Sequence, residues 1–134
     1  FGLNVIWRGQ QGGFKEMLRV FHQKQALALL IDQDTNVQSV FVPFFGKMAS
    51  TPAAVGVLAS RTKAPIIIGW LHRKSGGYQL NFERFNYQLS GEKTTDIQAI
   101  TAGVTQRLES AIRQAPQQWV WMHRRWKTRP PQEL

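Results

Sequence analysis

The sequence predicts an α/β domain built on a mixed, largely parallel sheet that is flanked by helices. Two observations predict this class. Residues 26–31 and 65–73 form two strongly apolar runs, as strands covered on both faces by helices do. Predicted strands and helices also follow one another in the order strand, helix, strand, helix, strand, strand, helix, which is typical of α/β domains.

The first three elements follow from local patterns. Residues 3–7 read as a short strand, which a Gly-rich and Gln-rich stretch ends. From Gly13, apolar side chains recur at helical spacing and predict an amphipathic helix of about three turns. Residues 26–31 form the next strand. The polar loop that begins at Asp32 therefore follows the carboxyl end of a strand, the edge at which open α/β sheets tend to bind ligands.

A second helix and a hairpin come next. Thr51 is the expected N-cap and Pro52 the first residue of a helix that continues to about Thr62. Residues 65–73 and 78–85 read as two strands joined by a Lys-Ser-Gly-Gly turn, which predicts a β-hairpin.

The clearest helix covers residues 95–114. Thr95 and Gln98 form a capping-box pattern at its start, and an apolar stripe at helical spacing follows. Pro116 marks its end.

Composition limits the classes of function. The 134 residues favour a single domain, and zero cysteines exclude disulfides, thiolate zinc sites and cysteine nucleophiles. No window of the sequence is apolar enough to span a bilayer. Seventeen basic and eight acidic residues give a net charge of +9, which favours an anionic partner such as nucleic acid, a membrane surface, a phosphorylated substrate or an acidic protein.

The stretch DQDTNVQSVFVPFFG at residues 32–46 is the first candidate site. Asp32 and Asp34 fit an acid/base pair, a metal site or, most simply, a pair that orders a tight turn. No obvious further metal ligands accompany them in the sequence. The aromatic run that ends at Gly46 is more typical of a core than of a cofactor site.

The terminal stretch is the second candidate site. It combines Trp119, Trp121 and Trp126 with four cations and no acid. Such a composition suits an anionic membrane interface, and it also suits a clamp on single-stranded nucleic acid. The simplest alternative is that one Trp face packs on the core while the cations are solvated.

Several motifs together carry a resemblance. DQDTNVQSVFVPFFGKMASTPAA, RTKAPII and the closing QWVWMHRRWKTRPP resemble the late acyltransferases of lipid A biosynthesis, the bacterial lauroyl/myristoyl acyltransferase family. That family is related to the lysophospholipid and glycerol-phosphate acyltransferases, so the resemblance implies their α/β fold, here incomplete. It also implies transfer of a fatty acyl chain from acyl carrier protein to a hydroxyl of a phosphorylated glycolipid, at the cytoplasmic face of the bacterial inner membrane.

The family's catalytic pair does not occur at the histidines of this sequence. The pair is a His followed five positions later by Asp or Glu, whereas Leu27, Gly77 and Thr128 stand five positions after His22, His72 and His123. We therefore expect no catalytic residue in this chain. We expect residues 1–134 to be the C-terminal part of a single acyltransferase domain, whose membrane anchor and catalytic segment lie N-terminal to it, and we expect this part alone to be inactive.

The resemblance and the residue types together give a predicted substrate-binding set: Asp32, Gln33, Asp34, Phe44, Phe45, Gly46, Arg124, Arg125 and Lys127. The acidic pair would order the loop or bind substrate hydroxyls, the phenylalanines would line the acyl side or the core beneath it, and the cations would face phosphate or lipid head groups.

The expected partners are acyl carrier protein, the phosphorylated acceptor and an anionic membrane surface. No metal, no cofactor and no nucleic acid is expected. The remaining alternatives are an acyltransferase for another glycolipid and, from a different class, a basic nucleic-acid-binding module.

Overall fold

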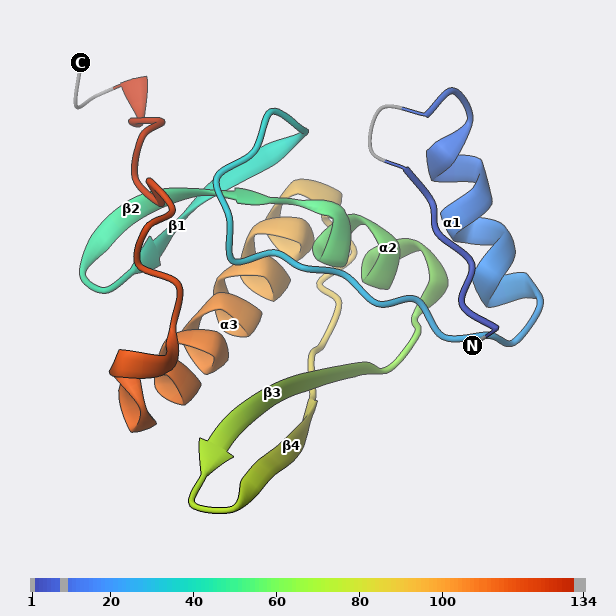
Figure 1. The fold of residues 1–134 in the computed structure, drawn as a ribbon. Coiled ribbons are helices and arrows are strands. Elements are labelled where there is room, and N and C mark those ends of the chain that lie inside the picture. The colour runs from blue at the N-terminus through green and yellow to red at the C-terminus, as the bar shows by residue number, and fades with distance from the viewer. Residues whose placement is uncertain (1, 8–9, 132–134) are drawn as a thin grey trace.

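The structure of the protein is a computed structural model that describes residues 2–7 and 10–131. Its helices and strands, in chain order, are α1 (Gly13–His22), β1 (Ser39–Phe44), β2 (Lys47–Pro52), α2 (Ala54–Thr62), β3 (Ile66–Lys74), β4 (Gly77–Phe85), α3 (Lys93–Gln114) and a 3₁₀ turn (Pro116–Gln118). Figure 1 shows the long helix α3 at the centre, with α2 and the β1–β2 pair on one side and the β3–β4 pair below.

The predicted parallel sheet is wrong. Within the described residues the strands form two separate antiparallel pairs, β1 with β2 and β3 with β4. The second pair is the hairpin that the sequence predicted, and Lys74 stands opposite Gly77 at its turn. The first pair was missed. The described residues therefore form two hairpins and three helices, in which α2 and both hairpins pack against α3 and α1 packs against α2.

The segment at residues 26–31 explains this error. It is extended, and its side chains alternate between half-buried or buried and exposed positions, but it is not a strand of either sheet. Ile31 packs into the core, whereas Leu30 is 90% exposed. Because only one face is covered, the run does not behave as the doubly covered strand that its apolar composition predicted. The strand predicted at residues 3–7 does not form either.

The start of α2 also differs from the prediction. Thr51 and Pro52 are the last residues of β2, so neither caps or begins the helix, and α2 starts at Ala54. Pro43 lies within β1, which pairs with β2 and with no other strand of the described residues. A proline is tolerated there because an edge strand leaves one row of N–H groups unpaired.

Helix α3 is confirmed, with a different cap. The Glu92 carboxylate accepts hydrogen bonds from the backbone N–H groups of Thr94 and Thr95, at 3.1 and 2.6 Å. Glu92 is therefore the N-cap, and the predicted capping box of Thr95 and Gln98 is not used. Gly56 of α2 lies so close to α3 that an added Cβ would come within 2.6 Å of the Ile97 carbonyl oxygen. This glycine permits the tight contact between the two helices.

Candidate functional site

The acidic loop is held by the C-terminal tail, residues 119–130. The Asp34 carboxylate accepts hydrogen bonds from the backbone N–H and the hydroxyl of Thr128, at 2.8 and 3.1 Å. The Asp34 side chain is almost completely buried. Hydrogen bonds to an ionised group are stronger than those between neutral groups. These two hydrogen bonds therefore attach the loop to Thr128, which is 94 positions away in the chain.

His123 completes the same attachment. Its Nε2 accepts a hydrogen bond of 2.8 Å from the Asp34 backbone N–H. This contact requires Nε2 to carry no proton. His123 thus helps to hold the loop through Nε2.

Asp32 is bound differently. One oxygen of its carboxylate, Oδ2, accepts a hydrogen bond of 3.2 Å from the indole N–H of Trp119. Its other oxygen has no hydrogen bond to the described residues. Gln33 lies between the two acids and is exposed. Of these three loop residues, Asp34 holds the loop in place, whereas Asp32 and Gln33 remain accessible to solvent.

Arg125 is the most deeply buried large side chain of the tail, at 1% exposure. Its guanidinium donates to the Ser50 carbonyl and to the Thr51 hydroxyl, both at 2.6 Å, and lies 5.1 Å from the centre of the Phe44 ring. Burial lowers the pKa of Arg125, while the charges of Asp34 and Asp32 act in the opposite direction.

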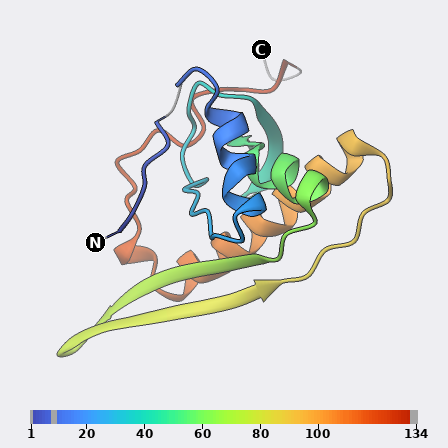
Figure 2. The same cartoon turned by 90° about the vertical axis from the view of Figure 1, so that its right-hand side faces the viewer.

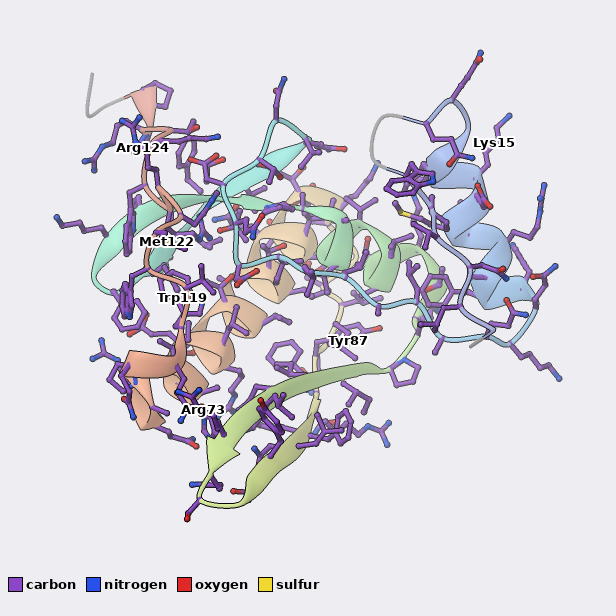
Figure 3. The ribbon with its side chains drawn as sticks, in the orientation of Figure 1. Lys15, Arg73, Tyr87, Trp119, Met122 and Arg124 are labelled. Carbon is purple, nitrogen blue, oxygen red and sulfur yellow. The ribbon has the colours of Figure 1, made fainter. Side chains whose placement is uncertain are left out.

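The three cations of the predicted set therefore have different positions. Arg124 and Lys127 are exposed, as expected for contact with phosphate. Arg125 was expected to face phosphate too, but the structure places it inside, where it joins the tail to β2. Figure 3 shows Trp119, Met122 and Arg124 in order along the tail.

The Phe44–Phe45–Gly46 run forms the β1–β2 turn. Phe45 and Gly46 have φ values of 50° and 75°, as a two-residue type I′ turn requires. The Phe45 N–H donates to the Glu109 carboxylate at 2.7 Å, and Arg113, which is paired with Glu109, lies 4.7 Å from the Phe45 ring centre. Helix α3 thus supports a conformation that is unfavourable for a phenylalanine.

An aromatic cluster surrounds Phe44, which is fully buried. The ring centres of Trp119 and Trp126 lie 5.7 and 5.6 Å from that of Phe44. Trp121 contacts Trp119 edge-on at 4.6 Å. Two of the three tail tryptophans therefore pack on the core, which agrees with the simplest alternative only in part, because that alternative left all the cations solvated and Arg125 is buried. Their packing also weakens the case for a nucleic-acid clamp, which needs exposed ring faces for stacking.

An apolar cavity of about 370 Å³ adjoins the loop. It lies between the extended segment at residues 26–31, strand β3 and helices α2 and α3. Its apolar lining includes Leu29, Ile31, Ile68, Trp70, Val104 and Leu108, and its polar lining includes Asp32, His72 and Gln118. A volume of this size is within the usual range for small-molecule sites, about 300–1,000 Å³.

The structure brings part of the predicted set together. Asp34, Phe44 and Arg125 lie at the junction of loop, turn and tail, with Asp32 and Phe45 beside them, and Gln33, Gly46, Arg124 and Lys127 are exposed around it. We call this junction the loop–tail cluster.

Sequence reasoning did not assign Ser50, Thr51, His123 and Thr128 to the loop–tail cluster, and it placed Trp119 in the tail without its contact to Asp32. One available signal was the alternation of Val40, Val42 and Phe44 before a glycine, which is typical of a hairpin strand. The partners of Asp34 and Arg125 have no such local signal.

In the described part of the chain, no histidine is hydrogen-bonded or ion-paired to a carboxylate, and no group of three or more potential metal-binding side chains gathers. Of the described helices, none is both long enough and apolar enough to cross a membrane.

Comparison with known proteins gives one consistent result. A family model described as bacterial lipid A biosynthesis acyltransferase matches residues 1–128. The lipid A biosynthesis lauroyltransferase of Escherichia coli (strain K12) is 29% identical over 118 residues, which are 87% of this chain and 38% of that protein.

Two further relatives agree. The lipid A biosynthesis palmitoleoyltransferase of the same strain is 34% identical over 103 residues, which are 74% of this chain and 32% of that protein, and the lipid A biosynthesis acyltransferase of Shigella flexneri gives the same values. The chain thus spans roughly a third of the length of the curated relatives that it matches.

Proposed function

Because the chain belongs to the bacterial lipid A biosynthesis acyltransferase family, we propose that its protein transfers a fatty acyl chain from acyl carrier protein to a hydroxyl of a lipid A precursor. Family membership confirms the resemblance seen in the sequence. The relatives are named as a lauroyltransferase and a palmitoleoyltransferase of lipid A biosynthesis. These names support a fatty acyl group as the group transferred and lipid A biosynthesis as the pathway. The net charge of +9 supports an acidic carrier and a phosphorylated acceptor.

The observation that carries the proposal is the apolar cavity beside Asp32. A fatty acyl chain needs a long apolar surface that excludes water, with polar groups near the reacting end. The cavity supplies the apolar walls through Leu29, Ile68 and Leu108, and the accessible oxygen of Asp32 is a suitable acceptor for a substrate hydroxyl. In this proposal the acyl chain lies along residues 26–31, rather than against Phe44, which is fully buried.

The exposed cations of the loop–tail cluster have a matching role. Arg124 and Lys127 would bind the phosphate of the acceptor or anionic head groups. Arg125 and Asp34 would act indirectly, because they hold the tail against β2 and the loop. The proposed place of the reaction, the cytoplasmic face of the inner membrane, follows from the donor and the acceptor.

The chemical step needs a base. The acceptor hydroxyl oxygen attacks the carbonyl carbon of the acyl thioester, the new C–O bond forms, the C–S bond breaks, and the hydroxyl proton passes to the base and then to the leaving thiolate. None of the three histidines of this chain has the family's partner acid five positions later. We propose that the base and its orienting acid belong to residues other than these 134.

The test changes one wall of the cavity. In the full-length protein, Leu29→Trp would fill part of the cavity, so kcat/KM should fall progressively as acyl-acyl carrier proteins of increasing chain length are compared. Each excluded methylene corresponds to roughly a fourfold loss, from about 0.8 kcal/mol of apolar transfer energy. Ala28→Trp is the matched control, because Ala28 belongs to the same extended segment but is exposed and does not line the cavity. Equal selectivity in the wild-type protein and both variants would contradict the placement of the acyl chain. No acyl transfer by the wild-type protein would contradict the function itself.

A further inference from the structure

The β3–β4 hairpin has one face that no other part of the described chain covers. The register pairs Ile67 with Arg84, Gly69 with Phe82, Leu71 with Leu80, and Arg73 with Tyr78. Since side chains alternate across a strand, these eight residues share one side of the hairpin, which we call the outer face. All eight are exposed.

The outer face is unusually apolar for an exposed surface. Its five large apolar or aromatic side chains are 53–71% exposed: Ile67, Leu71, Tyr78, Leu80 and Phe82. The opposite face is different, because Ile68 is in the core and His72 is buried. Figure 2 shows that the hairpin projects well beyond the helices, so its outer part is available for contact. A contiguous apolar group of this kind marks a site of interaction rather than ordinary solvent exposure.

The charges around the outer face are all positive. Arg73 and Arg84 belong to the face itself, and Lys74 is the next residue at the turn. The acid of this hairpin, Glu83, lies on the opposite face and pairs with Arg107 of α3 at 3.4 Å. The surface therefore combines aliphatic and aromatic side chains with cations and has no acid of its own among these eight residues.

We propose that the outer face of the β3–β4 hairpin binds the surface of an anionic lipid bilayer. Aliphatic side chains enter the region just below the head groups, aromatic side chains favour the boundary, and Arg73, Lys74 and Arg84 pair with lipid phosphates. A second copy of this chain fits less well, because a symmetric contact would bring the same cations together without any acid to pair with them. This inference rests on the proposed function in one respect: an enzyme that acts on a lipid must work at a bilayer.

The 134 residues contain no cysteine, so a cysteine introduced among them is unique there. Any cysteine elsewhere in the full-length protein is first replaced by serine. In the full-length protein, Leu80→Cys would be labelled with a polarity-sensitive fluorophore and mixed with vesicles of phosphatidylcholine, with or without phosphatidylglycerol. The emission should shift to shorter wavelength with the anionic vesicles only. Gln79→Cys is the matched control, because Gln79 is the adjacent residue on the opposite face and is also exposed. Its label should shift much less.

A charge variant gives the second arm. Arg73→Gln combined with Arg84→Gln should weaken partitioning onto the anionic vesicles roughly 25-fold, at about fivefold for each cation. High salt should weaken the binding of the wild-type protein in the same direction.

Three results would overturn the inference. The label at residue 80 could already be shielded without vesicles, which would mean that another protein segment covers the face. The shift could depend on protein concentration alone, which would indicate self-association. The protein could bind vesicles while both labels respond equally. The vesicles contain neither acyl donor nor acceptor, so none of these results depends on acyl transfer. An enzyme that is active on detergent-dispersed acceptor but shows no shift would lose only this inference.

Discussion

The tail and the outer face of the β3–β4 hairpin have similar compositions and opposite positions. Both combine large apolar side chains with cations and lack acids of their own. In the tail, Trp119, Arg125 and Trp126 turn inward and pack around Phe44. In the hairpin, the comparable side chains point to solvent.

Hydrogen-bond partners explain the inward positions of Trp119 and Arg125. The tail lies beside acceptors that need donors: the carboxylates of Asp32 and Asp34, the Ser50 carbonyl and the Thr51 hydroxyl. Leaving such groups unpaired in the core would be costly, so tail and core stabilise each other. The hairpin pairs its backbone within itself, and its outer side chains need only an apolar neighbour. Composition alone therefore does not distinguish a partner-binding surface from a segment that packs in the core.

The largest expected effect separates the two regions directly. Arg125→Ala should lower the free energy of unfolding by about 3 kcal/mol or more, because it removes the donors to the Ser50 carbonyl and the Thr51 hydroxyl and opens space beside Phe44. Arg124→Ala in the tail and Leu80→Ser in the hairpin should each change it by less than about 0.5 kcal/mol, since both side chains are exposed. Urea unfolding measures all three. Equal losses for Arg124 and Arg125 would contradict the inward position of Arg125.

The next effect tests the attachment of the loop to the tail. Asp34→Ala should cost about 2 kcal/mol, since it removes two hydrogen bonds to a buried carboxylate. Thr128→Val removes the hydroxyl of the pair and keeps the backbone donor. A double-mutant cycle of these two changes should give a coupling energy of about 0.5–1 kcal/mol. Gln33→Ala, in the same loop and exposed, is the control and should be close to neutral. Strict additivity would mean that the two residues do not act on each other.

The sequence predicted the locally determined elements well. Helices α1 and α3 and the β3–β4 hairpin follow from spacing and turn residues that lie close together in the chain, and they are confirmed. The β1–β2 hairpin was missed because Thr51–Pro52 resembled a helix start and because a proline such as Pro43 is rare inside a strand. In the structure the edge position of β1 accommodates Pro43, and Thr51 is used as an acceptor for Arg125.

The parallel sheet was predicted from composition, and composition was a poor guide. An apolar run forms a central strand only where neighbours pair with both of its edges, and residues 26–31 have no such neighbours among the described residues. The candidate site shows the same limit. The acids and the aromatic run were recognised, but their partners lie 74–94 positions away and have no local signature.

The smallest expected effect concerns α3, which carries the hairpin connection at its start and the tail at its end. Hydrogen bonds from the Thr95 side chain and backbone, and from the Thr94 backbone, lower the pKa of Glu92 from 4.5 to about 2. Because the pKa of Glu92 is lower in the folded state, the ionised Glu92 cap stabilises the fold. This contribution to stability is fully present above about pH 4.5 and disappears as the pH falls through about 2. The melting temperature of Glu92→Gln should therefore lie slightly below that of the wild type at pH 6, and this difference in melting temperature should disappear as the pH is lowered.

Glu83→Gln is the control, since the exposed Glu83–Arg107 pair should add nothing measurable to stability. A difference in melting temperature that stays constant from pH 6 to about 2 would show that the cap does not act through the charge of Glu92.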